Sequence, residues 1–357
     1  MPRPIRATFD LAAMRANLAL ARARAAGAKT WAVVKANAYG HGLLRAARVF
    51  EATDGFALLD LNEAVRLREA GVRQPILLLE GIFEVGDVAV VCEHSLSIVV
   101  HNAAQIEMLE LSGAPTRMPV YLKINTGMNR LGFHLTELPA VLERLQRCIV
   151  VGPITLMTHF SDADGPMGVA EQLKRFGKAT AKLGLPISTA NSAALLRYPQ
   201  THGDWTRPGI MLYGGSPFDN LSAEEIGLQP AMTLSSALIA VQELKTGEST
   251  GYGNLFRADR TMRVGVVAAG YADGYPRHAP TGTPVLVNGK RTRTVGRVSM
   301  DMMTVDLSDI PEANIGTPVT LWGEGLPADE VALFSGTVSY ELFCALSARV
   351  PQTDRAS

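Results

Sequence analysis

The chain contains few cysteines and has no excess of charge of either sign. Its 357 residues include only Cys92, Cys148 and Cys344, too few and too scattered for a disulfide framework or a C-x-x-C site. Lysine and arginine together number 34, as do aspartate and glutamate, so the formal net charge is zero. A balanced chain has no general attraction for nucleic acid or for an anionic membrane surface. We therefore expect neither as a partner.

Long apolar runs and nucleotide-binding motifs are also missing. No run of about 18 apolar residues offers a transmembrane helix. Residues 1–6 lead into a helix-start signal without the apolar segment of a signal peptide. Neither G-x-G-x-x-G nor G-x-x-x-x-G-K-[ST] occurs, which argues against dinucleotide or nucleotide chemistry. Asp162 and Asp164 near His159 have metal-ligand chemistry, but no second cluster completes a metal site. We expect a cytoplasmic protein without a metal.

The first two hundred residues alternate between short apolar runs and amphipathic helical stretches. Helices are predicted from Asp10 to Gly27 and from Asp60 to Gly71, the second with a capping-box glutamate at position 63. Eight strands are predicted, over residues 30–35, 55–59, 75–79, 96–100, 119–124, 153–159, 186–190 and 206–212. This alternation fits an α/β fold, a (β/α)8 TIM-type barrel. A doubly wound open sheet would alternate in the same way and stays an alternative.

After residue 230 the pattern changes to strands separated by turns. Strands are predicted over 234–241, 262–268, 284–287, 290–295, 298–307 and 318–322, with one short helix near 329–334. Asn288-Gly289 between two of these runs is a strong signal for a two-residue hairpin. We therefore predict a cofactor-binding barrel domain over residues 9–227 and a mostly β C-terminal domain over 228–357. Residues 1–8 are candidates for an additional strand of the second domain.

Lys35 ends the first apolar run and is followed at once by a glycine-rich turn, in the segment AVVKANAYGHG (32–42). A lysine at the end of a buried strand costs free energy of desolvation, so we expect it there only where its amine has a role. Desolvation lowers the pKa of an amine, so more of it is neutral and able to attack a carbonyl. The aldehyde of pyridoxal 5'-phosphate (PLP) forms a Schiff base with such a lysine. For an isolated VVK sequence, a strand-terminal lysine that reaches into solvent would be the better interpretation.

Other polar segments follow further predicted strands of the barrel. Barrel enzymes carry their active sites at the carboxyl ends of the strands, often with a phosphate site after strands seven and eight. The segments at these ends are KINTGMNRLG (123–132), MTHF (157–160), ANSAA (190–194) and RPGIMLYG (207–214). Together with Lys35 they predict one site at the rim of the barrel.

These motifs, with GYG (251–253), GYADGYPR (270–277) and GRVSMDMMTVDL (296–307), make the chain resemble the bacterial alanine racemases from end to end. That resemblance implies a PLP-dependent isomerase that interconverts L- and D-alanine, for peptidoglycan synthesis or alanine catabolism. It also implies a homodimer whose active sites are shared between subunits.

The resemblance further implies a role for individual residues. Lys35 would bind PLP and act as the base on one face of the substrate. Tyr252, from the partner subunit, would be the acid/base on the opposite face, because one base cannot easily serve both faces of a planar carbanion. A phenol has an ordinary pKa near 10, so its phenolate needs nearby positive charge. Without the resemblance, Tyr252 would be read as an ordinary turn aromatic.

Arg207 matches the residue that faces the pyridine nitrogen of the cofactor. A guanidinium offers only donors and does not deprotonate in practice, so that nitrogen stays neutral, which disfavours transamination. His159 would orient Arg207, and Lys123, carbamylated in some relatives, would support the arginine that binds substrate. Ser188 stands where some relatives carry a histidine, so the tuning of Arg207 is open.

The remaining matches concern the phosphate group, the substrate and the entrance of the site. The residues implied to bind the cofactor further include Tyr39, Asn191, Ser192, Gly209, Ile210 and Tyr340. Those implied to hold the substrate carboxylate are Arg130 and the backbone N–H of Met300, and those at the entrance are Tyr271 and Asp301. For Met300, Met302 and Met303, a place in the β-domain core is a strong alternative, because only a backbone role is implied.

Three alternatives stay open at this point. A racemase of broader specificity would also accept serine, since an apolar pocket rejects one added hydroxyl by only about a hundredfold. A PLP-dependent decarboxylase would be expected to carry a carboxylate opposite the ring nitrogen, in place of Arg207. A non-catalytic PLP carrier would need only the barrel, and the complete second domain with Tyr252 argues against it.

Overall fold

The structure is a computed structural model that describes residues 3–355. Within it the chain forms two compact units. One comprises residues 18–38 and 42–212, and we call it the barrel unit. The other comprises residues up to 17, residues 39–41 and the chain from residue 213, and we call it the β unit. No helix in the described part of the chain is long and apolar enough to cross a membrane.

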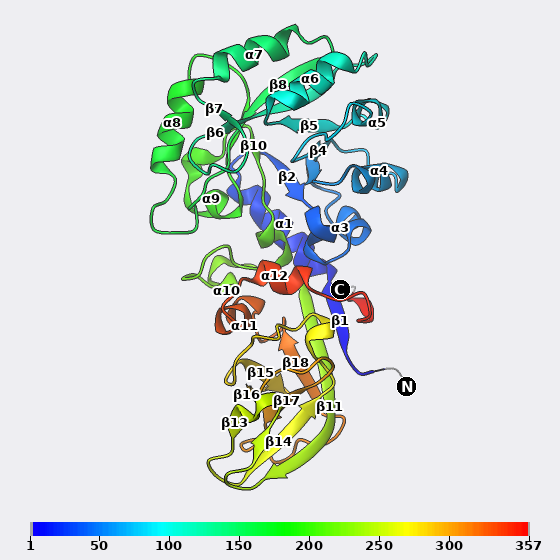
Figure 1. Ribbon diagram of the computed structural model, residues 1–357, viewed down its shortest axis with the longest axis vertical. Helices are drawn as coiled ribbons and strands as arrows, with labels where there is room; N and C mark the ends of the chain where they lie inside the picture. The colour runs from blue at the N-terminus through cyan, green and yellow to red at the C-terminus, as the bar shows by residue number, and fades with distance from the viewer. Residues whose placement is uncertain (1–2, 356–357) are drawn as a thin grey trace. The chain divides into compact units, whose positions relative to one another are not determined.

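Eight parallel strands form the centre of the barrel unit, in the order β10-β2-β3-β4-β5-β6-β8-β9 (Figure 1). Backbone hydrogen bonds from Asp204 to Ile187 and from Arg207 to Ala190 connect the two ends of this order. The sheet is therefore a nearly closed barrel, which confirms the predicted fold and excludes the open sheet. The strands are β2 (Lys29–Val33), β3 (Gly55–Leu58), β4 (Ile76–Leu78), β5 (Ser97–Val100), β6 (Met118–Asn125), β8 (Val151–Met157), β9 (Ile187–Ser188) and β10 (Trp205–Thr206), with β7 (Phe133–His134) beside β6.

Helices follow most of these strands and surround the barrel. The Asp60 carboxylate accepts from the Glu63 N–H and caps α4, as the sequence predicts. Asp10 caps α1 in the same way, through the Ala13 N–H. The helices are α1 (Leu11–Arg24), α2 (Lys35–Tyr39), α3 (Leu43–Val49), α4 (Leu61–Glu69), α5 (Asp87–Glu93), α6 (Ala103–Leu111), α7 (Leu138–Arg147), α8 (Ala170–Thr180), α9 (Ser192–Arg197) and the 3-10 helix η1 (Pro199–Thr201).

The prediction of an eighth strand over residues 206–212 is wrong in length. Only Trp205–Thr206 is strand, and the 3-10 helix η2 (Ile210–Tyr213) takes up the rest. Pro208 has no N–H to donate to a neighbouring strand, and the Gly209 N–H bonds to the Ser192 hydroxyl instead. The seventh strand is also shorter than predicted, because residues 189–191 leave the ladder to begin α9.

The β unit is built on a sheet in the order β14-β17-β16-β15-β18-β11-β1-β19, in which β14 also pairs with β11. That extra pairing closes six strands on themselves around a core. The long strand β11 makes it possible, because it shifts register between Leu238 and Ala240 and thus reaches three partners. The strands are β1 (Arg6–Asp10), β11 (Met232–Leu244), β14 (Met262–Val267), β15 (Pro284–Val287), β16 (Lys290–Val295), β17 (Met303–Asp306), β18 (Pro318–Trp322) and β19 (Gln352–Arg355), with the separate pair β12 (Ser249–Thr250) and β13 (Phe256–Arg257).

Most of the strands of the β unit agree with the prediction, and one is wrong. Asn288 and Gly289 both have positive φ and connect β15 to β16, as the hairpin signal predicts. The strand predicted over 298–307 begins only at Met303, because Ser299 and Met302 form a turn closed by a backbone hydrogen bond. The short helices are α10 (Ala223–Ile226), α11 (Ala328–Phe334), α12 (Ser339–Cys344), η3 (Tyr252–Asn254) and η4 (Tyr271–Asp273), of which only α11 is predicted.

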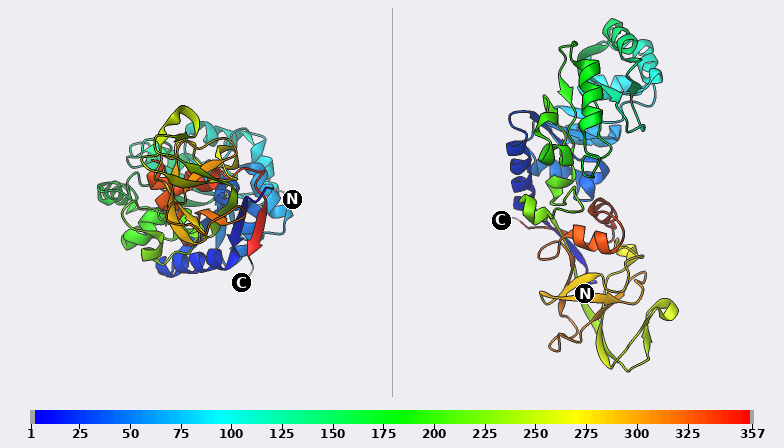
Figure 2. Two further views of the ribbon diagram at one scale, coloured as in Figure 1. Left: turned by 90° about the horizontal axis from the view of Figure 1, so that it is seen from below. Right: turned by 90° about the vertical axis from the view of Figure 1, so that its left-hand side faces the viewer.

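The strands nearest the two termini lie side by side in the β unit. Figure 2 shows β1 and β19 as the blue and red strands, and they pair in parallel from Ala7 and Gln352 to Asp10 and Arg355. Both ends of the chain thereby complete the same sheet. The domain limits of 9–227 and 228–357 stay a prediction.

Candidate active site

Lys35 follows β2 at the carboxyl end of the barrel, and the backbone after it has an unusual form. Ala36, Asn37 and Ala38 all adopt left-handed helical angles, with φ between 52° and 54°. Such angles cost about 1–2 kcal/mol per residue for side chains other than glycine, so tertiary contacts must maintain them. One such contact is the Asn37 side chain, which accepts from the Leu43 N–H at 2.8 Å. The turn immediately after Lys35 is thus held in a conformation it would not adopt alone.

Arg207 lies at the end of β10 and is 5% exposed. Its guanidinium donates to the Ser188 hydroxyl at 2.7 Å and to the Thr158 and Thr189 carbonyls at 2.8 and 3.2 Å. It also contacts His159 Nδ1 at 3.4 Å. No residue among 3–355 accepts a hydrogen bond from its Nε, and no carboxylate in that range pairs with it. The cation is held by neutral groups, and Nε is the one guanidinium nitrogen without an acceptor among residues 3–355.

The positive charge of Arg207 affects the groups around it. Burial, followed by the charges of Arg207 and Lys123, lowers the pKa of His159 well below its ordinary value. The imidazole is therefore neutral, and its Nδ1 can accept from the guanidinium. Burial and the nearby Arg207 and Arg130 lower the pKa of Lys123 from 10.5 to about 8. Lys35 contributes to both shifts, so it lies near this cluster.

Arg130 is exposed on the loop that follows β6. The Asn125 carboxamide fixes this loop by accepting from the N–H groups of Gly127 and Asn129, at 3.0 and 3.1 Å. A small pocket opens beside it, lined among others by Lys123, Thr126, Arg130, Thr158 and His159. The structure thus brings Lys123, Arg130 and His159 together, as the sequence predicts.

Four predicted cofactor-binding residues lie at the ends of β9 and β10. Asn191 caps α9 by accepting from the Ala194 N–H, which makes Ser192 the first residue of that helix. The buried Ser192 hydroxyl accepts from the Gly209 N–H at 2.8 Å. Gly209 and Ile210 open η2, and the first N–H groups of a helix have no intrahelical acceptor. Hydroxyl and amide donors of this kind suit a phosphate.

Tyr39 and Tyr340 belong to the β unit. Their ring centroids are 5.9 Å apart, and Tyr39 also stacks on Tyr213 at 4.8 Å. Burial, followed by the proximity of Tyr340 and Cys344, raises the pKa of the Tyr39 phenol above its ordinary value. This phenol stays protonated and can donate. Sequence reasoning missed Tyr213, although it lies within the RPGIMLYG segment.

Tyr252 lies in the loop between β12 and β13, on the β unit, and 70% of it is exposed. Gly251 and Gly253 on either side have φ of 79° and 75°, which present the phenol outward on a tight turn. Leu255 in the same loop is 64% exposed. Among residues 3–355, no side-chain hydrogen bond or ring contact joins Tyr252 to the other predicted residues of the β unit.

Tyr271, Met300 and Asp301 do come together. The Tyr271 N–H donates to the Ser299 carbonyl at 3.0 Å, and the Ala272 N–H donates to the Met300 carbonyl at 3.0 Å. Tyr271 and Met300 are 37% and 52% exposed, so Met300 is not a core residue. Sequence reasoning missed the carbonyls of Thr158, which lies within the quoted segment MTHF, and of Thr189, which immediately precedes the segment ANSAA.

A parallel barrel with cationic side chains at its strand ends, followed by an antiparallel β domain, defines a two-domain α/β-barrel enzyme. The chain matches the family models of the alanine racemase N-terminal domain over residues 9–217 and C-terminal domain over 231–354. The chain belongs to the alanine racemase family, whose members are isomerases that interconvert L- and D-alanine. The resemblance of its motifs is thereby confirmed.

Individual relatives agree closely. The alanine racemase of Nitrosospira multiformis is 56% identical over 353 residues, which cover 98% of this chain and 99% of the relative. The crystal structure of the biosynthetic alanine racemase from Pseudomonas aeruginosa has a TM-score of 0.97 at 47% identity, covering 99% and 100% of the two chains. The crystal structure of the alanine racemase from Bacillus anthracis with bound L-Ala-P has a TM-score of 0.85 at 32% identity. The match covers 100% of this chain and 96% of that chain. The activity of this chain is that of an alanine racemase.

The lowered pKa of Lys123 gives a pH-dependent contribution to stability. Between about pH 8 and 10.5 the unfolded chain binds the lysine proton more tightly than the folded chain, so this group makes stability rise with pH. We expect the free energy of unfolding of the wild type to increase relative to that of Lys123→Met across this range, in urea titrations. Lys174→Met, an exposed lysine of α8, serves as the control and should leave the difference flat. A flat difference for Lys123→Met as well would contradict the shift.

Proposed function

We propose that Lys35 carries pyridoxal 5'-phosphate and that this chain racemises alanine with two acid/base groups, Lys35 and Tyr252. When bound, PLP supplies an aldehyde for the substrate amine and an electron sink that makes the Cα proton acidic. The supporting observation is the set of groups around Lys35. A cation with a spare donor, a neutral histidine and a cluster of neutral phosphate-binding groups all lie at the same end of the barrel.

The phosphate would be held by neutral donors. The Ser192 hydroxyl has its oxygen fixed by the Gly209 N–H, so its hydrogen remains available to a phosphate oxygen. Gly209 thus positions that hydroxyl, Ile210 would contribute its N–H at the start of η2, and Asn191 fixes the turn before Ser192. Tyr39, whose phenol stays protonated, and its neighbour Tyr340 add phenolic donors. Such a donor set binds a dianion without a permanent positive charge beside it.

Arg207 would donate from its Nε to the pyridine nitrogen. The other guanidinium nitrogens are occupied by Ser188, Thr158, Thr189 and His159, which fix the plane of the group. A donor-only partner keeps the ring nitrogen unprotonated. Ser188 takes over the support that a histidine gives in some relatives, since its hydroxyl both accepts from Arg207 and donates to the Trp205 carbonyl.

Substrate alanine would lie between the two bases, with its carboxylate on Arg130 and on the backbone N–H of Met300. Tyr252 and Met300 are largely exposed, and the surface of a partner subunit would cover them, which supports the proposal of a homodimer with shared sites. Tyr271, beside Met300, would narrow the entrance and favour a methyl side chain over larger ones. The reaction would supply D-alanine for peptidoglycan synthesis or serve alanine catabolism.

We further propose a cytoplasmic location. Cys92, Cys148 and Cys344, all within the described residues, carry thiols and form no disulfide bond. Thiols without disulfide partners are typical of a reducing compartment.

Labelling with borohydride tests the attachment of PLP. We expect reduction of the cofactor-loaded protein, followed by digestion and mass spectrometry, to place the pyridoxyl group on the peptide that contains Lys35. Lys35→Ala should take up no label and should not racemise L-alanine. Lys174→Ala, an exposed lysine of the same unit, is the control. A label on any other lysine would rule the assignment out.

Tyr252→Phe tests the second base, because it removes only the acid/base hydroxyl. We expect exchange of the Cα proton of L-alanine with solvent deuterium to fall by about 10²–10⁴-fold, with a much smaller loss from D-alanine. Absorbance of the bound cofactor should be unchanged. Equal losses from both enantiomers would contradict the two-base assignment.

Mixing two inactive variants tests the shared sites. In a homodimer with shared sites, a hybrid of Lys35→Ala and Tyr252→Phe subunits has one intact site. Random exchange of subunits should therefore restore about a quarter of the wild-type activity. Each variant incubated alone is the control. If native mass spectrometry shows hybrids and activity does not return, the sites are not shared.

A further inference from the structure

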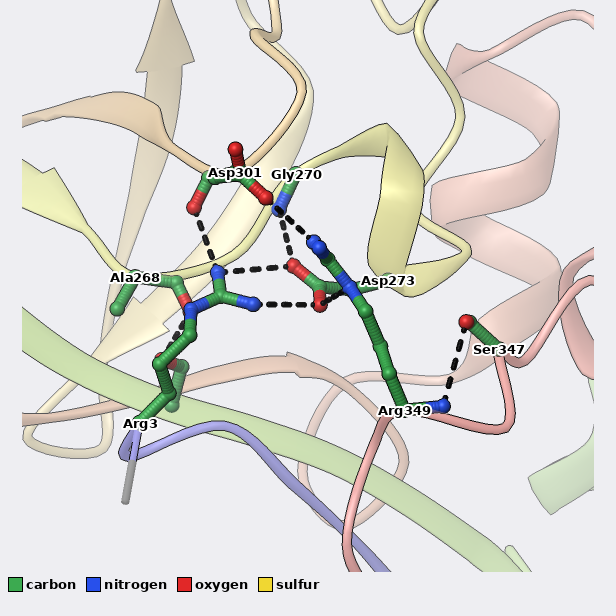
Figure 3. A network of polar contacts seen from close by, with 8 residues as sticks. Arg3, Ala268, Gly270, Asp273, Asp301, Ser347 and Arg349 are labelled. Atoms are coloured by element: carbon green, nitrogen blue, oxygen red, sulfur yellow. Dashed lines mark hydrogen bonds and ion pairs between the residues drawn. The ribbon is translucent and has the colours of Figure 1, made fainter. Parts of the chain in front are cut away.

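Two arginines converge on one buried carboxylate in the β unit (Figure 3). Asp273 is fully buried, and Arg3 donates to both of its oxygens, at 2.8 and 3.1 Å. Arg349 Nε donates to the same carboxylate at 2.8 Å, and the Gly270 N–H donates to it at 2.9 Å. Arg3 precedes β1 and Arg349 precedes β19, so segments from both ends of the chain meet at this carboxylate.

The same arginines extend to a second acidic residue. Arg349 donates to the Asp301 carboxylate at 2.7 Å, and Arg3 donates to the Asp301 backbone carbonyl at 2.8 Å. Asp273 and Asp301 lie on two different segments, η4 with its flanking glycines and the turn before β17. Each arginine therefore bridges the two segments.

The bridged segments are those that carry Tyr271 and Met300. Between them the backbones are in close contact, since a Cβ at Gly270 would lie 2.4 Å from the Met300 and Ser299 carbonyls. Because Gly270 has no side chain, the segments of Tyr271 and Met300 can approach each other. Two backbone hydrogen bonds join them, from the Tyr271 N–H to Ser299 and from the Ala272 N–H to Met300. The charged network adds a third link, one that acts on the residue immediately after Met300.

The buried carboxylate is ionised in this setting. Burial by itself raises the pKa of Asp273, but the hydrogen bonds from Arg3, Arg349 and the Gly270 N–H outweigh burial and lower it overall. A buried carboxylate paired in this way is costly to leave without its partners. Asp273 therefore favours the arrangement in which Arg3 and Arg349 both donate to it, and in this arrangement both arginines also reach Asp301.

We propose that the network of Arg3, Asp273, Arg349 and Asp301 is a positioning device that fixes the Met300 backbone N–H and the Tyr271 ring relative to each other. This inference rests on the proposed function, in which Met300 binds the substrate carboxylate and Tyr271 narrows the entrance. The network touches neither substrate nor cofactor. Arg3, Asp273 and Arg349 therefore act on specificity and substrate binding through the two segments they join.

Arg349→Lys is the variant that separates this role from simple folding. Arg349 uses Nε for Asp273 and a terminal nitrogen for Asp301, and a single ammonium cannot reproduce this forked geometry. Charge is retained, and Arg3 still pairs with Asp273. The side chain is 40% exposed, so the substitution leaves no cavity in the core.

Arg355→Lys is a matched control. Arg355, 52% exposed, lies in β19, the strand that follows Arg349, and it also bridges two carboxylates, those of Asp10 and Glu324. Asp10 belongs to β1 and Glu324 to the loop after β18. These contacts of Arg355 therefore do not involve the segments that carry Tyr271 and Met300. Both variants thus lose an arginine that bridges two carboxylates, and they differ only in where that bridge lies in the β unit.

For Arg349→Lys we expect KM for L-alanine to rise about fivefold to tenfold, with kcat within about twofold of the wild type, because a substrate-binding amide is displaced and the bases are not. Arg355→Lys should change neither constant. Independently of activity, hydrogen exchange of the peptide covering 299–302 should quicken at least about fivefold in Arg349→Lys and not in Arg355→Lys. The melting temperature of Arg349→Lys should fall by no more than that of Arg355→Lys, and the absorbance of the bound cofactor should stay at its wild-type value.

The outcomes that overturn the proposal are distinct from those that overturn the function. If the wild type racemises alanine but Arg349→Lys changes neither KM nor hydrogen exchange, the positioning role of the network is contradicted and the proposed function still stands. Equal losses in kcat, KM and melting temperature would make the network merely structural. If the wild type neither takes up the label on Lys35 nor racemises alanine, the proposed function is contradicted. The effect of the network on substrate binding is then contradicted as well.

Discussion

A cation without a counterion is the constraint around which the barrel unit is organised. Arg207 is buried, and carbonyls, a hydroxyl and an imidazole surround its guanidinium in place of a carboxylate. Burying a charge on neutral groups alone is expensive, so its nitrogens need acceptors, and only Nε has none within residues 3–355. The neighbouring groups respond, since His159 becomes neutral and the pKa of Lys123 falls to about 8. The positive field and the unused Nε are what the barrel offers to a ligand.

The β unit presents the opposite arrangement. There a buried carboxylate, Asp273, is the centre, and two arginines from the chain ends surround it. The exposed residues expected to act on a partner's site, Tyr252 and Met300, lie on turns rather than in the core. Turns need an external constraint to hold a side chain within catalytic tolerance. For Met300 the arginine network supplies that constraint, whereas Tyr252 depends on the two positive-φ glycines that flank it.

Much of this could be predicted from the sequence, and the failures have definite causes. Asp60 and Glu63 marked the start of α4, and Asn288-Gly289 marked a hairpin, because both signals act within a few residues. The predicted strands over 206–212 and 298–307 were too long, because a run of apolar residues does not reveal where tertiary bonds interrupt it. At Gly209 the interrupting partner is Ser192, 17 residues away.

The sequence alone determined the barrel, the second domain and the family, and it predicts which lysine reacts, since these depend on periodicity and on motifs that are contiguous in the chain. Only the tertiary structure decided which nitrogen of Arg207 remains available, that His159 is neutral, and that Arg3 and Arg349 share one carboxylate. Those properties arise from burial and from contacts between residues as far apart as positions 3 and 273. Sequence patterns carry no information on such distances, because desolvation and pairing exist only once the chain has folded.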